Sequence, residues 1–394
     1  MKSGMSSETI VQQNPIPRRQ VLIQGGAAAA GLAILPTDIF RGWLSGFEQE
    51  AVIPWVQRPH PGLTERMNIL NWEELDSWIT PVSQMFHVGH YGSPVIAESD
   101  WSLEIGGLVD RPRTFSLAQL RERPRQEVVF TLECSGNRGR PSFIGGVHNA
   151  RWAGARLADV LSDAGVQDEG IEVVFFGADE GEEEIRGNTV TQNFARSLSL
   201  EDAMDPGIIL AWEVNGEPLP NAHGFPLRVI APGWYGIANV KWLTRIELRD
   251  RRFMGKFMAR DYVTLRAEAR DGATVWTETS VGRVNINSVP AKVTRNGDAY
   301  AIHGAAWGAD IVRVEVRVDD GAWRAATLGE GQSDPDTWTF WRADWDATPG
   351  EHTIVSRAID ADGNVQPAAD DPMLVNKRTY WESNGQLSRA VLID

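Results

Sequence analysis

The sequence predicts an α+β chain, in which a mixed α/β domain is followed by an all-β sandwich domain of immunoglobulin type. Over residues 81–265, apolar β-branched strands alternate irregularly with short amphipathic helices, unlike the regular order of a parallel βαβ fold. Over residues 270–394, short strands of alternating polarity are separated by Gly- and Asp-containing turns. A length of 394 residues also favours more than one domain.

Local patterns predict the elements of the first domain, which we place at residues 51–265. Residues 127–134 are apolar and β-branched, as in a buried strand, and residues 101–105 alternate in polarity. Ser116 is a possible N-cap for a helix over 117–123, and Gly165 ends a helix over 157–164. Further strands are predicted at 171–177, 225–230 and 240–248, and a further short helix at 199–204.

The second domain, placed at residues 270–394, is predicted from strict alternation. Residues 311–318 alternate over their whole length, and the Asp-Asp-Gly turn at 319–321 starts a hairpin. Residues 337–341 and 352–359 continue the pattern. This domain contains no cysteine and no catalytic cluster, so we expect it to serve assembly.

Composition excludes several classes of function. The net charge of -15 argues against binding nucleic acid or anionic lipid, since both require a basic surface. The single cysteine, Cys134, rules out an intramolecular disulfide, a four-cysteine zinc site, a cysteine-ligated iron–sulfur cluster and a C-x-x-C-H haem attachment. Neither a P-loop nor a Gly-rich dinucleotide motif follows a strand, so nucleotide binding has no support.

The N-terminal 50 residues are predicted to be an export signal and linker. Arg18 and Arg19 precede an apolar run over 21–35, which is too short to span a bilayer. This pattern is similar to a twin-arginine signal, which predicts a periplasmic or other extracytoplasmic protein. Cleavage and retention as an anchor both remain open, and the alternative interpretation is the basic start of an ordinary helix.

Chemistry is predicted around Cys134, which ends the buried strand at 127–134 and precedes a Ser-Gly-Asn-Arg turn. Arg138 would favour the thiolate, which is either a nucleophile or a soft metal ligand. A nucleophilic cysteine needs a histidine partner, for which His90, His148 and His223 are candidates. The remaining alternative is an inert buried cysteine.

Three segments resemble the sulfite oxidase family. Residues 134–138 (C-S-G-N-R) resemble its molybdenum-ligand motif, and residues 223–228 (H-G-F-P-L-R) resemble its HGFPxR stretch. Residues 231–243 resemble its P-G-x-x-G-x-x-x-VKWL stretch. The resemblance extends from about residue 81 to the C-terminus, and the β-sandwich is similar to the family's dimerisation domain. It therefore implies a homodimer.

The resemblance implies one pyranopterin (molybdopterin) cofactor, with Cys134 as the protein's sulfur ligand to molybdenum. His90, His223, Arg228 and Lys241 match cofactor-binding positions of the family. Arginine and lysine suit the phosphate of the cofactor. Taken by themselves, His87 and His90 could instead form a zinc pair, but no third ligand is near in sequence.

The resemblance also implies catalytic residues and a reaction. Tyr262 matches an active-site tyrosine, and Arg138 is the arginine left for holding an anion, with Arg140 close by. The expected activity is transfer of an oxygen atom to sulfite or a related sulfur compound. Because this chain has no haem motif, electrons would leave to an external acceptor such as a cytochrome c.

Two departures from the family put the substrate in question. Val88 stands where the family has a sulfite-binding arginine, and Gly139 replaces the second arginine of the cysteine motif. The pocket is therefore predicted to be less positive than a sulfite site. A reductase of sulfoxide-type substrates on the same cofactor is one alternative, and a non-catalytic exported binding protein is another.

Overall fold

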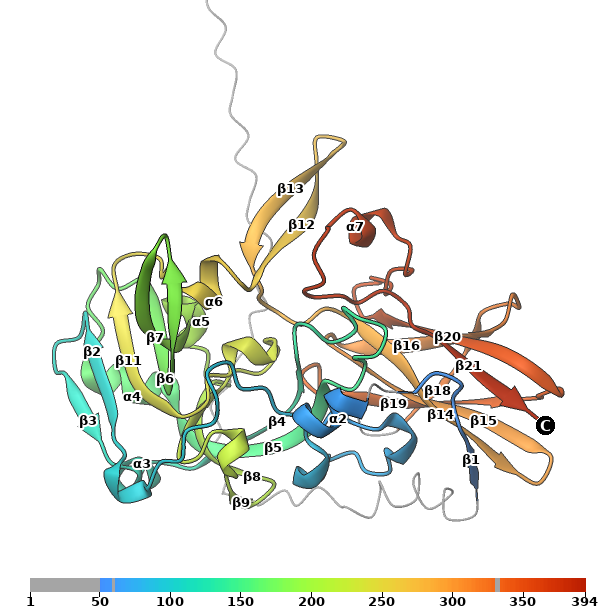
Figure 1. The fold of residues 1–394 in the computed structure, drawn as a ribbon, viewed down its shortest axis with the longest axis horizontal. Helices are drawn as coiled ribbons and strands as arrows, with labels where there is room; N and C mark the ends of the chain where they lie inside the picture. Colours follow the sequence, from blue (N-terminus) through green and yellow to red (C-terminus); the bar gives the residue numbers. More distant parts are fainter. Residues whose placement is uncertain (1–49, 59–60, 330–333) are drawn as a thin grey trace, which may run out of the picture.

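The computed structural model describes residues 50–58, 61–329 and 334–394, so Arg18, Arg19 and the apolar run at 21–35 lie outside it. Two lobes lie side by side, and strands dominate both (Figure 1). The longest helix in the described ranges has eight residues. No helix of the described residues is long and apolar enough to cross a membrane.

The first lobe contains two five-stranded sheets. In one of them, β2 (Leu103–Gly107) and β11 (Leu243–Arg249) form a parallel pair, and the other neighbouring strands are antiparallel. The second sheet is antiparallel throughout, with β9 (Glu217–Pro218) attached to β8 (Ile209–Val214). The first sheet has the order β3 (Arg113–Phe115), β2 (Leu103–Gly107), β11 (Leu243–Arg249), β6 (Glu172–Ile185), β7 (Asn188–Ser199). The second has the order β10 (Arg228–Ile230), β8 (Ile209–Val214), β5 (Val147–Arg156), β4 (Gln126–Glu133), with β9 at Glu217–Pro218.

Short helices cover the core between these two sheets. α3 (Leu117–Arg121) begins with a capping box in which Ser116 and Gln119 bond each other's backbone N–H groups. α4 (Leu157–Ala164) ends at Gly165, whose φ of 74° suits a left-handed C-cap. Both helices were predicted from their caps. The shorter α5 (Leu200–Ala203) and α6 (Lys256–Ala259) complete the lobe.

The second lobe is a two-sheet sandwich. Alternating side chains such as Val314, Trp341 and Ile354 are buried between its sheets, as the strict alternation predicted. One sheet has the order β1 (Ala51–Ile53), β14 (Asn287–Asn296), β15 (Ala299–Trp307), β19 (Thr339–Trp345), β18 (Thr327–Leu328). The other has the order β17 (Arg324–Ala325), β16 (Ile311–Val318), β20 (Gly350–Asp360), β21 (Ser388–Ile393). Immunoglobulin-type connectivity stays a prediction.

The structure corrects the predicted boundary at residue 51. β1 pairs with β14, and the buried Trp55 donates its indole N–H to the Ala291 carbonyl at 2.8 Å. Residues 51–55 therefore belong to the sandwich, although they precede the first lobe in sequence. A three-residue strand carries too little periodicity for the sequence to assign it.

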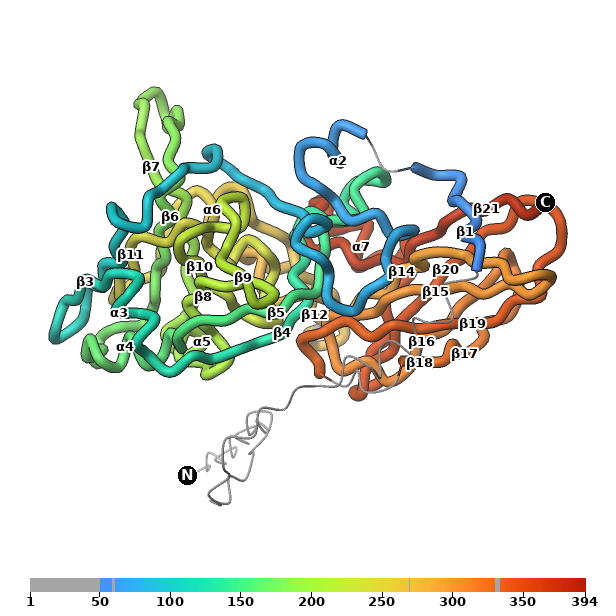
Figure 2. Tube along the Cα trace, turned by 90° about the horizontal axis from the view of Figure 1, so that it is seen from below, coloured from blue at the N-terminus to red at the C-terminus, as the bar shows by residue number. Residues whose placement is uncertain are grey.

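Two other segments lie between the lobes. After α2 (Pro61–Met67), Trp72 packs among second-lobe tryptophans, whereas Met85 and Phe86 pack on the β4–β5 sheet, so this segment crosses from one lobe to the other (Figure 2). The β12–β13 hairpin (Val263–Arg270 and Ala273–Ser280) is a two-stranded sheet of its own, which stands apart from the sheets of the two lobes (Figure 1). The predicted boundary at 265–270 thus falls inside a hairpin. α7 (Pro372–Val375) belongs to the loop before β21.

Candidate functional site

A cavity in the first lobe collects most of the predicted site residues. It holds about 640 Å³ of empty space, part of which is open to solvent. Its lining comes from the end of β4 and the turn after it, from the interior of β6 and β7, and from the starts of β5 and β10. The loops that precede β2, β10, β11 and β12 complete it. Six of the seven predicted site residues line it: His90, Cys134, His223, Arg228, Lys241 and Tyr262. The seventh, Arg138, does not.

The Cys134 thiol is held at the wall of this cavity by a tight turn. The Cys134 N–H donates to the Gly146 carbonyl at 2.8 Å, and the Asn137 N–H donates to the Cys134 carbonyl at 2.8 Å. The Asn137 side-chain oxygen accepts from the Gly146 N–H at 3.0 Å. Burial raises the pKa of the Cys134 thiol to about 11, and the neighbouring Glu133 raises it further. Since the pKa is raised, the expectation that Arg138 favours the thiolate is wrong for the protein by itself; a bound metal would displace the proton.

Arg138 points away from the cavity. Its φ of 64° is left-handed, and its guanidinium donates to the Asn287 side chain in β14. It lines a separate groove together with Lys377. The structure therefore does not bring Arg138 to the site, and its predicted catalytic contact with an anion has no geometric support. Arg140 lies with its guanidinium carbon 5.8 Å from the centre of the Tyr380 ring.

Glu133, next to Cys134, joins the site to the second lobe. Its buried carboxylate accepts hydrogen bonds from Asn137 at 2.9 Å, Asn287 at 3.2 Å and the Trp307 indole at 2.9 Å. Burial raises the pKa of Glu133 to about 7 despite these donors. The cysteine turn is thus fixed against β14 and β15 through polar contacts that the sequence did not reveal.

Three cofactor-binding candidates, His223, Arg228 and Lys241, form one side of the cavity, which we call the cation wall. The Arg228 guanidinium donates to the carbonyls of His223 and Asn239, each at 3.0 Å, and Lys241 Nζ donates to the Ala222 carbonyl at 2.8 Å. Within the described ranges, no carboxylate oxygen lies within 4.0 Å of either cation. Burial lowers the pKa of Arg228 to about 9 and that of Lys241 to about 7.

Close packing explains the His-Gly pair of the HGFPxR stretch. Gly224 has a φ of 102°, and a Cβ atom there would come within 2.9 Å of the Lys241 Cβ and 3.0 Å of its Cα. Only glycine lets the His223 turn pass so close to Lys241, which lies just before β11. Burial lowers the pKa of His223 to about 3, so its imidazole is neutral at pH 7.

His90 and Tyr262 form a hydrogen-bonded pair on another wall. Their Nε2 and Oη atoms are 2.7 Å apart. The His90 ring stacks on Phe194 at 4.7 Å, and burial, with Lys241 and Lys256 nearby, lowers its pKa to about 4. Burial and then the Cys134 thiol raise the pKa of Tyr262. At pH 7 both groups are therefore neutral, and one hydrogen bond joins them.

Two alternatives for these residues lose their support. No hydrogen bond joins the Cys134 thiol to a histidine in the part of the chain that the structure describes, so a Cys–His nucleophile is not assembled. The same residues contain no group of three or more His, Cys, Asp or Glu side chains that could hold a metal ion, which argues against zinc at His87 and His90.

Three further polar residues line the cavity, of which the sequence analysis gave a role only to His148, as a possible partner of the cysteine. Asp179 Oδ1, Ser135 Oγ and both ring nitrogens of His148 are buried without a hydrogen-bond partner among the described residues. Burial raises the pKa of Asp179 to about 6. The strand predicted at 171–177 continues in the structure to Ile185 as β6, so Asp179 lies inside it, where the pairing with β7 is irregular. No local pattern of the sequence indicated this position.

The donor set fits a molybdopterin cofactor. Two cations without carboxylate partners suit a phosphate, and orphaned buried polar atoms suit a heteroaromatic ring that carries donors and acceptors. One thiol at the cavity wall suits a soft metal. The residues present thus match the group that the resemblance implies.

Comparisons with known proteins agree with this geometry. Residues 90–257 match the family model described as "Oxidoreductase molybdopterin binding domain", and residues 275–383 match "Mo-co oxidoreductase dimerisation domain". The chain is 34% identical to the mitochondrial sulfite oxidase of Drosophila melanogaster over 353 residues, which cover 80% of this chain and 58% of that protein. It is 32% identical to the sulfite oxidase of Gallus gallus, with 80% and 72% covered.

A solved structure is similar to the chain over nearly its whole length. The sulfane dehydrogenase SoxCD from Paracoccus pantotrophus superimposes with a TM-score of 0.71 and 27% sequence identity, covering 94% of this chain and 95% of that chain. The chain spans 58% of the length of the Drosophila enzyme and 61% of the human one. With the cysteine turn and cation wall in place, these likenesses show that the chain belongs to the sulfite oxidase family of molybdenum-cofactor oxidoreductases.

Proposed function

We propose that this chain is an exported, molybdenum-dependent oxidoreductase that adds an oxygen atom to sulfite or a related sulfur compound. The observation that carries the proposal is the joint placement of the Cys134 thiol, the Arg228 and Lys241 cations and the His90–Tyr262 pair around one cavity. Most of the curated relatives are sulfite oxidases, one is a nitrate reductase, and the structural neighbour is a sulfane dehydrogenase, so oxidation of a sulfur compound is the chemistry that most of them share.

The reaction balances with water as the oxygen source. Sulfite and water give sulfate, two protons and two electrons, and the electrons leave singly to an external acceptor such as a cytochrome c. When bound, molybdopterin supplies the oxygen transfer and accepts the electron pair. The chain's own residues bind and orient: Cys134 holds the metal, whereas His223, Arg228 and Lys241 hold the pterin and its phosphate.

Tyr262 and His90 form another wall of the cavity in which the substrate would react. Because both are neutral at pH 7 and hydrogen-bonded to each other, they offer a placed hydroxyl without adding a charge. Apolar rings of Phe194 and Phe257 pack against His90 and keep water from it. We assign Tyr262 the role of orienting the oxygen that reaches sulfur.

The part of the cavity that would face the substrate carries fewer arginines than the family pattern places there. Val88 lines the cavity at the position of the missing arginine. A Cβ at Gly139 would lie 2.7 Å from the Tyr380 carbonyl oxygen and 2.8 Å from its ring, so no arginine fits there without movement. We therefore expect weak affinity for the sulfite anion, and a neutral sulfoxide, reduced in the reverse direction, is the second candidate substrate.

Metal content and kinetics test the proposal. Purified protein should contain about one molybdenum per chain, in line with one thiolate ligand; protein without molybdenum would favour the non-catalytic alternative. Val88→Arg should lower the Michaelis constant for sulfite roughly 10- to 100-fold, the value of one charge-assisted contact. Val95→Arg, at a position that is 88% exposed, is the matched control and should leave it unchanged.

Export and assembly are separate parts of the proposal. Replacing Arg18 and Arg19 by lysine keeps the charge but removes the twin-arginine pair, so the variant should accumulate in the cytoplasm. Unimpaired export would indicate a different route. The dimerisation-domain match supports a homodimer, which sedimentation velocity would test directly.

A further inference from the structure

The second lobe reaches into the site through an aromatic stack. The Trp381 ring lies 4.2 Å from the Tyr262 ring with an interplanar angle of 27°. The half-buried Trp381 in turn contacts the Tyr380 ring at 4.1 Å. Trp381 belongs to the loop before β21 (Ser388–Ile393), far from Tyr262 in sequence. A catalytic candidate of one lobe is therefore packed on a side chain of the other.

The loop that carries Trp381 is fastened through the next residue, Glu382. The Glu382 N–H donates to the Ser135 carbonyl at 2.8 Å, which ties the loop to the cysteine turn. The Glu382 carboxylate, only 2% exposed, accepts from Arg266 at 2.8 Å and from the Gly282 N–H at 2.9 Å. Arg266 lies in β12 and Gly282 follows β13, so both anchors belong to the hairpin that begins directly after Tyr262 or to its exit. The position of Trp381 is thus set by buried contacts.

The cysteine turn leaves room for the same ring. A Cβ at Gly136 would lie 3.3 Å from Cζ3 of Trp381, closer than most side-chain contacts. Glycine at this position of C-S-G-N-R therefore lets the indole lie against the turn that presents the Cys134 thiol. One indole contacts both the metal-ligand turn and the tyrosine.

We infer that Trp381 is a positioning residue, which holds the Tyr262 ring so that its Oη remains bonded to His90 Nε2. The inference rests on the proposed function for the role of Tyr262. His90 is fixed between Phe194 and Phe257, whereas the Tyr262 ring lies 6.2 Å from Phe257 and only 4.2 Å from Trp381, so its placement depends mainly on the indole. Offset stacking restrains the plane of the Tyr262 ring and hence the place of its hydroxyl. The active site is complete only with the second lobe present.

A double-mutant cycle separates positioning from simple packing. Trp381→Leu should lower kcat roughly 10- to 100-fold, as small misplacement of an orienting group does. Trp381→Phe keeps a stacking ring and should stay within about threefold of the wild type, since stacking does not require an indole. In a Tyr262→Phe background, which lacks the hydroxyl, Trp381→Leu should cause no further loss of kcat. An equal fold-loss in both backgrounds would overturn the inference.

A second readout does not depend on turnover. The ¹⁵N chemical shifts of the His90 ring report whether its Nε2 remains hydrogen-bonded. We expect Trp381→Leu, or Trp381→Met if the leucine variant does not fold, to move the His90 signal, and Trp381→Phe to leave it in place. An unmoved His90 signal in the leucine or methionine variant would overturn the inference whatever the kinetics show.

The matched control is Trp345→Leu, which removes a buried indole from the same lobe, where it contacts Tyr300 rather than the site. It should lower thermal stability without moving the His90 signal. If the wild type loaded with molybdenum oxidises no sulfur compound, the proposed function fails. The His90 signal then still decides whether Trp381 positions Tyr262.

Discussion

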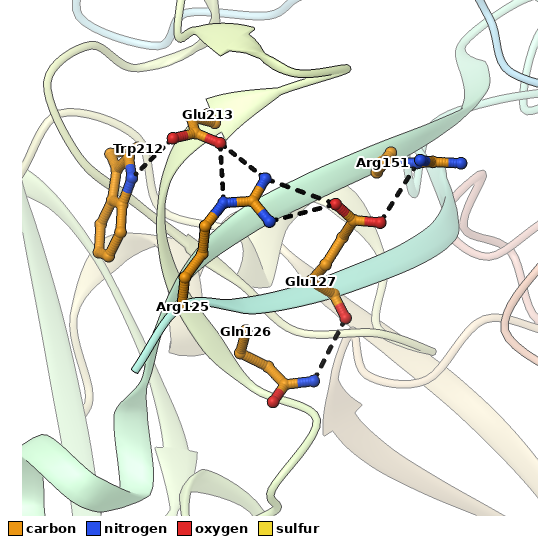
Figure 3. A network of polar contacts seen from close by, with 6 residues as sticks. All are labelled: Arg125, Gln126, Glu127, Arg151, Trp212 and Glu213. Atoms are coloured by element: carbon orange, nitrogen blue, oxygen red, sulfur yellow. Dashed lines mark hydrogen bonds and ion pairs between the residues drawn. The ribbon is translucent and has the colours of Figure 1, made fainter. Parts of the chain in front are cut away.

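Two arginines on the same sheet have opposite surroundings. Arg125 directly precedes β4 on the exposed side, where it donates to Glu213 at 2.8 Å and to Glu127 at 3.3 Å (Figure 3). Arg228, on β10 at the other edge, is 4% exposed and donates only to carbonyls. Hydrogen bonding to Glu213 raises the pKa of Arg125, whereas burial lowers that of Arg228 to about 9.

The different surroundings of Arg125 and Arg228 indicate different roles for their charges. A surface arginine shared between carboxylates, with Arg151 also near Glu127, fastens strand ends and adds little stability (Figure 3). A buried cation without a carboxylate is costly, unless an anion supplied from outside completes it. We therefore interpret the cation wall of the cavity as a preformed phosphate site, and the following experiments test that contrast.

The largest effect is expected for the metal ligand. Cys134→Ser removes the chain's thiol, so turnover should fall by more than about 100-fold, since even outer-shell partners of a metal cost 10- to 100-fold. The protein should stay folded and retain part of its pterin, because the cation wall is intact. Molybdenum content, pterin fluorescence after oxidation and sulfite turnover are the measurements. Near-normal activity would remove Cys134 from the metal site.

Arg228→Gln removes the buried cation from the comparison with the surface Arg125. Losing one charge-assisted phosphate contact should weaken cofactor retention by one to two powers of ten, or about 1.5–3 kcal/mol. Pterin and molybdenum content after dialysis measure this. Lys256→Gln, outside the cavity lining, is the control. Full retention in the Arg228 variant would mean that the wall does not hold the phosphate.

Lys241 predicts a pH dependence of the cofactor-free protein. Its pKa falls from 10.5 in the unfolded chain to about 7 on burial, so between these values only the unfolded chain binds the proton. Stability should therefore rise as the pH increases from about 7 to 10.5. Lys241→Met should flatten this rise in urea unfolding at several pH values. The same slope in both proteins would show that Lys241 is not the group concerned.

The smallest effect is expected for the surface arginine of the comparison, Arg125. Arg125→Gln removes a pair whose arginine side chain is 46% exposed, so it should cost no more than about 1 kcal/mol of unfolding free energy. Cofactor retention should equal that of the wild type. A loss of cofactor from this variant would show that the sheet, rather than the cation wall, controls binding.

Local sequence was sufficient wherever one segment carried the whole pattern. Residues 157–164 with Gly165 and residues 311–318 were placed correctly, because capping and alternation depend on near neighbours. The Cys134 turn was predicted at a strand end for the same reason, and the comparisons confirm the family that its motif suggested. The export signal remains a prediction.

Tertiary structure alone decided which side chains face the cavity. The motif placed Arg138 four residues after Cys134, yet its left-handed backbone directs the guanidinium to Asn287. Nothing near Tyr262 in sequence indicated Trp381, and nothing near Cys134 indicated Trp307.

The physical reason is the range of the interactions. Helix caps, turns and alternating polarity depend on residues that are close in sequence. The sequence by itself was therefore sufficient to predict the helices and strands, the position of the thiol and the motifs that carry the cations. Burial, desolvation and ring stacking act between segments brought together only by folding. They decided that Arg228 and Lys241 lack carboxylate partners and Asp179 Oδ1 a hydrogen-bond partner among the described residues, and that Trp381 of the second lobe packs on Tyr262.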